Sequence, residues 1–124
     1  MDKYQAIQSF WSGFGWDAFN EHTVPDNAFN TRDGYITYAV TEAEFGYPVQ
    51  TNASIWQRSA GWTGVLTKAK QIERELSNGG KLIPCDEGVI WIKMGAPFAQ
   101  TLMDVDDSVR RVYLTLEVEF LTTV

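Results

Sequence analysis

The chain is poor in the residues from which most small active sites and metal sites are built. Its 124 residues include one histidine, His22, and one cysteine, Cys85. A single cysteine excludes an intrachain disulfide and agrees with a reducing compartment such as the cytoplasm. A single histidine with no neighbouring nucleophile and no second histidine at metal-ligand spacing is typical of a loop residue. We therefore expect a protein that is not an enzyme and that needs no cofactor or metal.

Basic residues and long apolar runs are also scarce. Ten lysines and arginines face sixteen acidic residues, which gives a formal net charge of −6. Binding to phosphates requires clustered basic side chains, and Arg110-Arg111 is the only adjacent basic pair. No apolar run approaches the roughly 20 residues of a membrane span, and Met1 to Gln5 lack the pattern of a signal peptide. The sequence predicts neither specific nucleic-acid binding nor a membrane location.

The residues that are abundant are those of a soluble folded domain. Hydrophobic residues make up 44% of the chain and aromatic residues 14%. A chain of this length forms a single domain, residues 1–124, with a normal core. Some of the aromatic side chains are expected to cover contact surfaces instead of filling the core.

Two helices are expected from apolar residues at helical spacing. The first runs from Asp2 to about Gly13, where Asp2 and Gln5 form a capping-box pattern. The second runs from Gly61 to Asn78 and has a single apolar stripe, with Ser59 as the expected N-cap.

Several segments alternate between apolar and polar residues, which is typical of strands with one buried face. The clearest is Val112 to Phe120. The expected extended segments are Trp16 to Glu21, Tyr35 to Thr41, Val49 to Ser59, Lys81 to Cys85, Val89 to Met94 and Val112 to Phe120. Because most of them pair as hairpins, the fold class is α+β: a mainly antiparallel sheet of about four to five strands with two helices packed on one face.

The segment between the last two strands is the first candidate contact region. A Gly95-Ala96-Pro97 break and an apolar run, Phe98 to Met103, predict a mobile arm that precedes an acidic turn. Its candidate contact residues are Phe98, Leu102, Met103, Asp104, Asp106 and Asp107.

The face of the sheet opposite the helices is the second candidate. It carries Trp56, Trp91 and Tyr113, which is too aromatic for a plain solvated surface. These side chains either form a subunit interface or are covered by the first helix or by the long connection from His22 to Asp33. Along the last strand, the outward residues expected to meet a neighbour are Tyr113, Thr115, Glu117 and Glu119.

A chemical role for the acidic turn is the alternative from another class. Asp104, Asp106 and Asp107, together with His22, could line the cleft of a small ligand-binding or hydrolytic domain. The turn lacks the glycine and the distal glutamate of a calcium loop, which favours a solvated turn or a contact segment.

The order of segments carries a resemblance to a known family. The phrases are VPDNAFNTRDGYITY, ELSNGGKLIP, EGVIWIKMGAPFAQTLMD and the closing VYLTLEVEF. Across nearly its whole length the chain resembles the tail terminators, or minor capsid proteins, of long-tailed bacteriophages. The alternative function within the same class is that of a head-completion or stopper protein of the connector.

The resemblance implies a structural role. Such proteins form a ring, usually a hexamer, that caps the tail tube and joins it to the head connector. The implied partners are further copies of the chain, the tail tube protein and a head-connector protein, while DNA passes through without specific binding. The implied location is the virion at the head–tail junction, after assembly in the host cytoplasm. The family offers no catalytic residues to transfer to this sequence.

Overall fold

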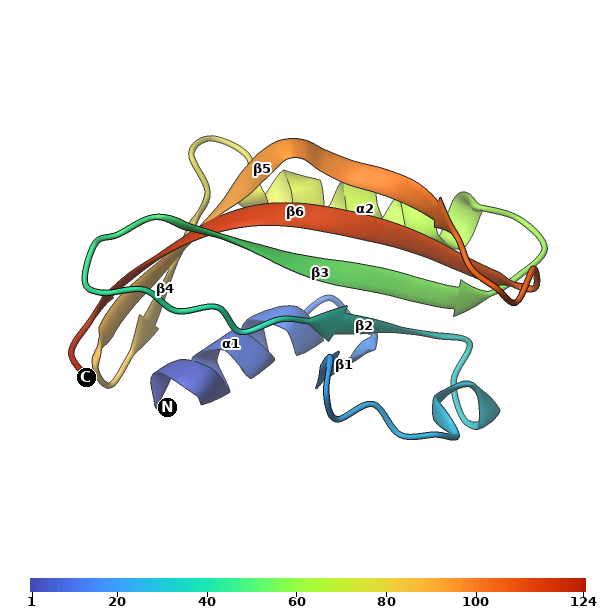
Figure 1. Cartoon of the computed structure of the whole chain (residues 1–124), viewed down its shortest axis with the longest axis horizontal. Coiled ribbons are helices and arrows are strands. Elements are labelled where there is room, and N and C mark those ends of the chain that lie inside the picture. The colour runs from blue at the N-terminus through green and yellow to red at the C-terminus, as the bar shows by residue number, and fades with distance from the viewer.

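The alternating segment near the end of the chain forms a central strand of a single sheet. A computed structural model describes all of residues 1–124 (Figure 1). Its elements are α1 (Lys3–Ser12), β1 (Asp17–Asn20), the 3-10 turn η1 (Ala28–Asn30), β2 (Gly34–Tyr38), β3 (Val49–Arg58), α2 (Thr63–Leu76), β4 (Lys81–Cys85), β5 (Gly88–Met103) and β6 (Val109–Thr122). No helix is long and apolar enough to cross a lipid bilayer.

The sheet has six strands in the order β1-β2-β3-β6-β5-β4. Strands β1 and β2 pair in parallel, and every other pair is antiparallel. The expected α+β class with a mainly antiparallel sheet is therefore confirmed. The strand count is higher than expected because the short segment after α1 joins the sheet as a parallel edge strand.

Both helices cover the same face of the sheet, as predicted (Figure 1). Alternate residues of β6 point into this layer and are 4% exposed or less, because every second side chain of a strand points to the same face. The core residues of the helices and of β6 are Ala6, Ile7, Trp11, Val65, Ala69, Ile72, Leu76, Val112, Leu114, Leu116, Val118 and Phe120. Burial of this apolar surface holds the two layers together.

The starts of the two helices test the capping residues that the sequence predicts. The Asp2 carboxylate accepts a hydrogen bond from the Gln5 amide at 2.8 Å, and the Gln5 side chain accepts one from the Asp2 amide at 2.9 Å. The predicted capping box of α1 is confirmed. The predicted N-cap of α2 is wrong, because this helix begins at Thr63 after Trp62 and has no side-chain cap. Ser59 lies too far upstream, and its hydroxyl accepts from the Gly61 amide at 3.2 Å instead.

The prediction of a mobile arm from Gly95 to Met103 is also wrong. This segment is the second half of β5 and continues to pair with β6 after an irregularity between Met94 and Ala99. At Gly95 the chain passes so close to β6 that a Cβ atom would lie 2.7 Å from Thr115 Cγ2 and 2.9 Å from its carbonyl oxygen. Thr115 is buried beside this close approach, so it is not the outward contact residue that the alternation predicted.

Candidate contact surface

The outer face is the face of the sheet opposite α1 and α2. The register of the ladder places Tyr35 of β2 beside Trp56 of β3, and Trp56 beside Arg111 of β6. The Tyr35 and Trp56 rings stack with centroids 6.3 Å apart. The Arg111 guanidinium lies 4.4 Å from the Trp56 ring centroid and 5.6 Å from that of Tyr113. Together these four residues form a continuous row, which we call the aromatic row.

Hydrogen bonds hold the polar atoms of the aromatic row. The indole nitrogen of Trp56 donates to Thr37 Oγ1 at 2.9 Å. Arg111 Nε donates to Ser54 Oγ at 3.1 Å. These bonds fix the orientation of the planar groups, so the row is a pre-organised surface. Cation–π contacts of this kind contribute about 0.5–1 kcal/mol at exposed sites.

Strand β1 and the long connection that follows it cover one end of the row. The Phe29 ring lies 5.0 Å from the ring of Tyr35, and the Phe19 ring lies 5.9 Å from it. Tyr35 is consequently buried, and this burial raises the pKa of its hydroxyl above the ordinary value. Phe29 of the connection and Phe19 of β1 thus cover Tyr35, which is not one of the predicted contact residues. Trp56 and Tyr113 remain half-buried, with part of each ring exposed.

Trp91 belongs to a separate cluster on the same face. Its indole nitrogen donates to the Gly79 carbonyl at 2.8 Å, and the Lys93 ammonium lies 4.0 Å from its ring centroid. Lys93 also pairs with Glu117 at 3.4 Å and with Glu119 at 3.5 Å. Trp91 and both glutamates thus already have partners within the chain.

The candidate residues of the second half of β5 lie in different environments. Phe98 packs against the core, so it is not a free contact residue. Leu102 is half-buried and pairs with Arg111 beside the aromatic row. Met103 is 81% exposed and is the member of this group that is open to a partner.

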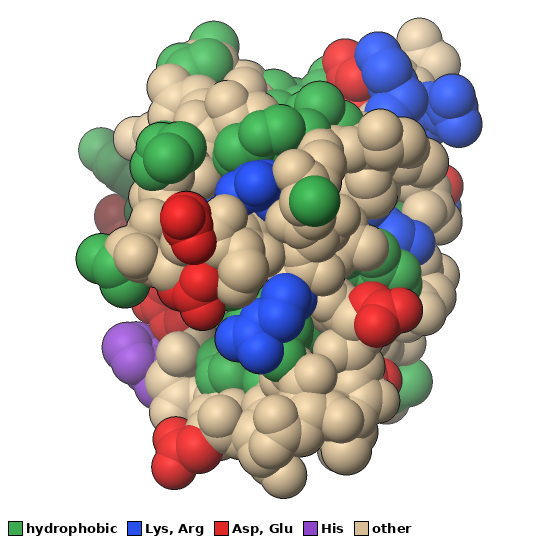
Figure 2. All heavy atoms as spheres, turned by 90° about the vertical axis from the view of Figure 1, so that its right-hand side faces the viewer, with side chains coloured by type: hydrophobic (Ala, Val, Ile, Leu, Met, Phe, Trp, Pro, Cys, Tyr) green, Lys and Arg blue, Asp and Glu red, His purple; other side chains and the backbone are tan.

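The three carboxylates of the acidic turn after β5 differ in their contacts, because Asp106 is bonded within the chain and Asp104 and Asp107 form no ion pair. Asp106 accepts from the Ser108 amide at 2.9 Å and from its hydroxyl at 2.6 Å, and it pairs with Arg58 at 3.6 Å. The bonds from Ser108 hold the pKa of Asp106 below its ordinary value. Asp104 is half-buried and Asp107 exposed, and neither makes an ion pair. On the end of the molecule that faces the viewer in Figure 2, acidic, basic and hydrophobic side chains are interspersed.

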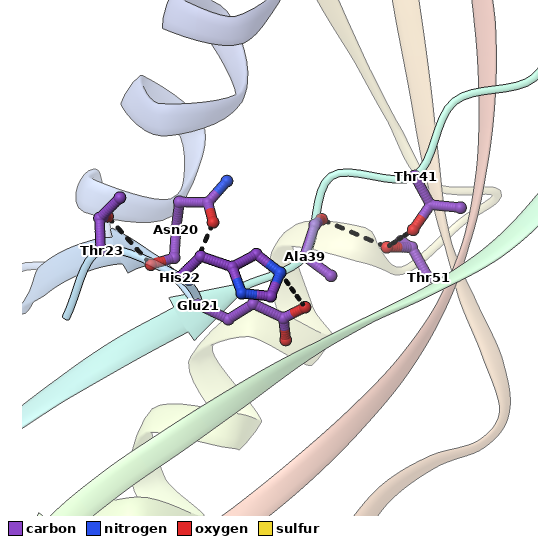
Figure 3. Close-up of polar contacts among 7 residues, drawn as sticks. All are labelled: Asn20, Glu21, His22, Thr23, Ala39, Thr41 and Thr51. Carbon is purple, nitrogen blue, oxygen red and sulfur yellow. Dashed lines mark hydrogen bonds and ion pairs between the residues drawn. The ribbon is translucent and has the colours of Figure 1, made fainter.

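His22 lies on the molecular surface, away from the main surface hollows. It is exposed in the turn after β1, with Nε2 3.5 Å from Glu21 Oε1 and its amide bonded to Asn20 Oδ1 at 3.0 Å (Figure 3). None of the larger surface hollows is lined by His22, Asp104, Asp106 or Asp107. No three His, Cys, Asp or Glu side chains are grouped so that they could hold a metal ion.

Two exposed aromatic residues in the β2–β3 connection were missed by sequence reasoning. Phe45 is 70% and Tyr47 62% exposed. The connection is nevertheless held in place. The Gly46 amide donates to the Phe120 carbonyl at 3.1 Å, and the Thr51 hydroxyl donates to the Ala39 carbonyl at 3.3 Å (Figure 3). The sequence feature that could have revealed them is a pair of aromatic residues in a segment with neither strand nor helix periodicity.

Comparison with known proteins identifies a shared fold. No family model matches the sequence, and no curated protein matches it. A chain of a solved structure described as the virion of a native gene transfer agent (GTA) particle superposes with a TM-score of 0.61 and 12% sequence identity. The match covers 94% of this chain and 89% of the other. At this identity the similarity is one of fold, and it extends over essentially the whole domain of both chains.

Proposed function

We propose that this chain is a structural protein of a phage-like virion that caps the tail tube as a ring and joins it to the head connector. The observation that carries the proposal is the fold shared with a chain of a gene transfer agent virion across 94% of this chain. The resemblance of the sequence to tail terminators supports the position at the head–tail junction.

The arrangement of exposed apolar side chains is compatible with a ring. A closed ring makes head-to-tail contacts, so each subunit needs two different contact surfaces. Phe45 and Tyr47 lie in the β2–β3 connection at one end of the sheet. Met103 and Val105, which are 81% and 104% exposed, lie at the β5–β6 turn at the opposite end (Figure 1). The two pairs supply two unlike surfaces.

The proposal assigns the chain no catalysis and no specific DNA contact. The polar and charged groups of the outer face mainly bind one another, as Arg111 does with Ser54 and Lys93 with Glu117 and Glu119. A net charge of −6 suits a ring through which DNA passes, because such a wall does not retain phosphates.

Electron microscopy of the purified protein tests the proposal directly. We expect rings, with six subunits the leading expectation from the resemblance. Where assembly needs the tail tube, deletion of the coding sequence from its parent particle should give tails of undefined length. A strict monomer at high concentration, together with tails of normal length in the deletion, would contradict the proposal. Labelling the subunit in intact particles distinguishes a tail terminator from a stopper nearer the head.

A further inference from the structure

The second half of β5 is an open edge of the sheet. Strand β4 pairs with β5 only from Gly88 to Ile92. Beyond that point β5 pairs with β6 alone, at Lys93 and Met94 and then from Ala99 opposite Leu114 to Met103 opposite Arg110. The opposite side of the strand from Ala99 to Met103 has no neighbouring strand.

The pattern of hydrogen bonds shows which backbone groups face outward. The bonds from the Arg58 amide to Asp33 and from the Ala39 amide to Asn52 show that even-numbered residues of β3 bond to β2. In an antiparallel sheet, successive residues of a strand direct their backbone N–H and C=O groups to opposite neighbouring strands. Odd-numbered residues of β3 therefore bond to even-numbered residues of β6. Odd-numbered residues of β6 then bond to β5. The hydrogen bond of 2.9 Å from the Ser59 amide to the Ser108 carbonyl agrees with this assignment, because it joins an odd residue next to β3 to an even residue next to β6.

It follows that Leu102 and Gln100, which oppose Arg111 and Tyr113, bond to β6. The N–H and C=O groups of Ala99, Thr101 and Met103 therefore point away from the sheet. No other hydrogen bond within the chain reaches these groups.

The paired part of this edge is open along five residues, between the irregularity that follows Met94 and the acidic turn. From Ala99 to Met103 it has no charged residue and no proline. The edge at β1 differs because its Ala18 carbonyl already accepts a hydrogen bond from Gln8 Nε2 at 2.8 Å.

An apolar hollow of about 370 Å³ lies between the open edge and α2. Leu66, Ala69, Phe98 and Ala99 form its apolar lining, and Leu66 is 45% exposed. The ion pair of Lys70 with Glu73, 3.2 Å, lies at its border. A strand added beside β5 would place alternate side chains over this hollow. Backbone hydrogen bonds would then supply affinity, and the fit of these side chains in the hollow would select the sequence of the added strand.

We propose that an extended segment of a different protein adds to the sheet as a strand along Ala99–Met103. Its inward side chains are apolar and fill the hollow beside α2. One end of the segment is basic, because Asp104 and Asp107 at the end of β5 make no ion pair with any residue of the chain. The inference deepens the proposed function by describing the segment that a partner in the virion would contribute.

A second copy of this chain fits the edge less well. The edge at β1 is one residue shorter than Ala99–Met103, and its Ala18 carbonyl is already bonded to Gln8. Two β5 edges in parallel would bring their acidic turns together, and two in antiparallel orientation would close as a dimer and not as a ring.

Selection from a displayed library of random twelve-residue peptides tests the proposal on the isolated chain. We expect enriched peptides that alternate apolar residues and carry lysine or arginine at one end. Thr101→Pro removes an outward N–H that β6 does not use, so the β5–β6 ladder stays intact while binding falls at least tenfold. Thr101→Val keeps the N–H and is the matched control, with binding close to that of the unmodified chain. Hydrogen exchange at Ala99, Thr101 and Met103 should slow when an enriched peptide is bound.

Two results would overturn the proposal: no enriched peptide, or enriched peptides that bind Thr101→Pro as tightly as the unmodified chain. If Thr101→Pro does not fold, Leu66→Lys places a charge in the hollow and should weaken the same peptides. Unchanged binding to this variant counts against the proposal equally. Because the selection uses no virion, its failure is distinguishable from failure of the tail assignment, which is judged from rings and tail lengths.

Discussion

At the scale of single residues, Glu42 joins the β2–β3 connection to the start of α1. Its carboxylate lies 3.1 Å from the ammonium of Lys3, which is only 8% exposed, and it accepts a hydrogen bond from the Tyr4 hydroxyl. The bond from Tyr4 is the main cause that lowers the pKa of Glu42. In turn, the bond to Glu42 is the main cause that raises the pKa of Lys3.

These shifts define the pH range over which the contact stabilises the fold. The lowered pKa of Glu42 gives stability that is present above its ordinary value of 4.5 and is lost as the pH falls through the folded-state pKa. The raised pKa of Lys3 gives stability that is present below 10.5 and is lost as the pH rises through its folded-state value. The contact is therefore complete between these limits.

We expect Glu42→Gln to lower the melting temperature at neutral pH, because the amide carries no charge to pair with Lys3. The difference from the unmodified protein should shrink as the pH falls below 4.5 and through the lowered folded-state pKa of Glu42, because the native carboxylate then also loses its charge. Thermal melts across this range are the measurement. Glu44→Gln is the control, since Glu44 makes no ion pair, and an equal effect of both variants would contradict the assignment.

Gly95 provides a test of the close approach between β5 and β6. Gly95→Ala should destabilise the fold by about 1–3 kcal/mol, because the new methyl group meets Thr115 at 2.7 Å. Gly61→Ala is the matched control: a Cβ at this position meets no atom within 4 Å. Urea unfolding of both variants gives the comparison, and equal stability of the two would show that β5 runs elsewhere.

At the scale of secondary-structure elements, the assignment of Gly95 to Met103 as a strand separates two candidate residues. Phe98→Ser should cost about 1–3 kcal/mol of unfolding free energy, since a half-buried aromatic ring leaves the core. Met103→Ser should change stability by less than about 0.5 kcal/mol, since this side chain is 81% exposed. Chemical denaturation distinguishes them. A mobile arm would instead leave both variants as stable as the unmodified chain.

The elements that could be predicted are those whose signal is local. Alternation over Val112 to Phe120 depends only on which face of a strand is buried, and the Asp2–Gln5 capping box spans a single turn of helix. The second half of β5 was missed because Gly95-Ala96-Pro97 is typical of a break. Its pairing partner lies in β6, which follows it in the chain, and only the pairs from Ala99–Leu114 to Met103–Arg110 show that the strand continues.

The candidate surface was predictable only in part, because some of its contacts depend on the pairing of strands that are distant in the sequence. Alternation correctly placed Trp56 and Tyr113 on the face opposite the helices. That Arg111 lies between them depends on the register of β3 against β6, strands more than 50 residues apart in the chain. The cover over Tyr35 comes from Phe19 of β1 and from Phe29, which lies in a connection without any periodicity.

At the scale of the whole molecule, the two exposed ends of the sheet predict how assembly can be blocked. Replacing Phe45 and Tyr47 with serine should abolish rings, because exposed aromatic side chains commonly anchor interfaces. The melting temperature of the monomer should stay nearly unchanged, since both side chains project from the surface. Light scattering and melting curves provide the two readouts.

The control for this pair is Leu82→Ser, an exposed apolar residue of β4 that lies on neither proposed contact. It should leave ring formation intact. Rings that persist in the Phe45 and Tyr47 variant would move the subunit contact to another surface.

The strand order has a consequence for synthesis of the chain. Of the six strands of this sheet, β6 is made last, yet it lies between β3 and β5 in the middle of the sheet. While residues 109–122 are still inside the ribosome, β3 and β5 have no common neighbour and the helices have no complete sheet to cover. A nascent chain therefore has no stable partial fold to offer a partner. The domain becomes competent to assemble in one late step, after β6 has emerged and joined its two neighbours.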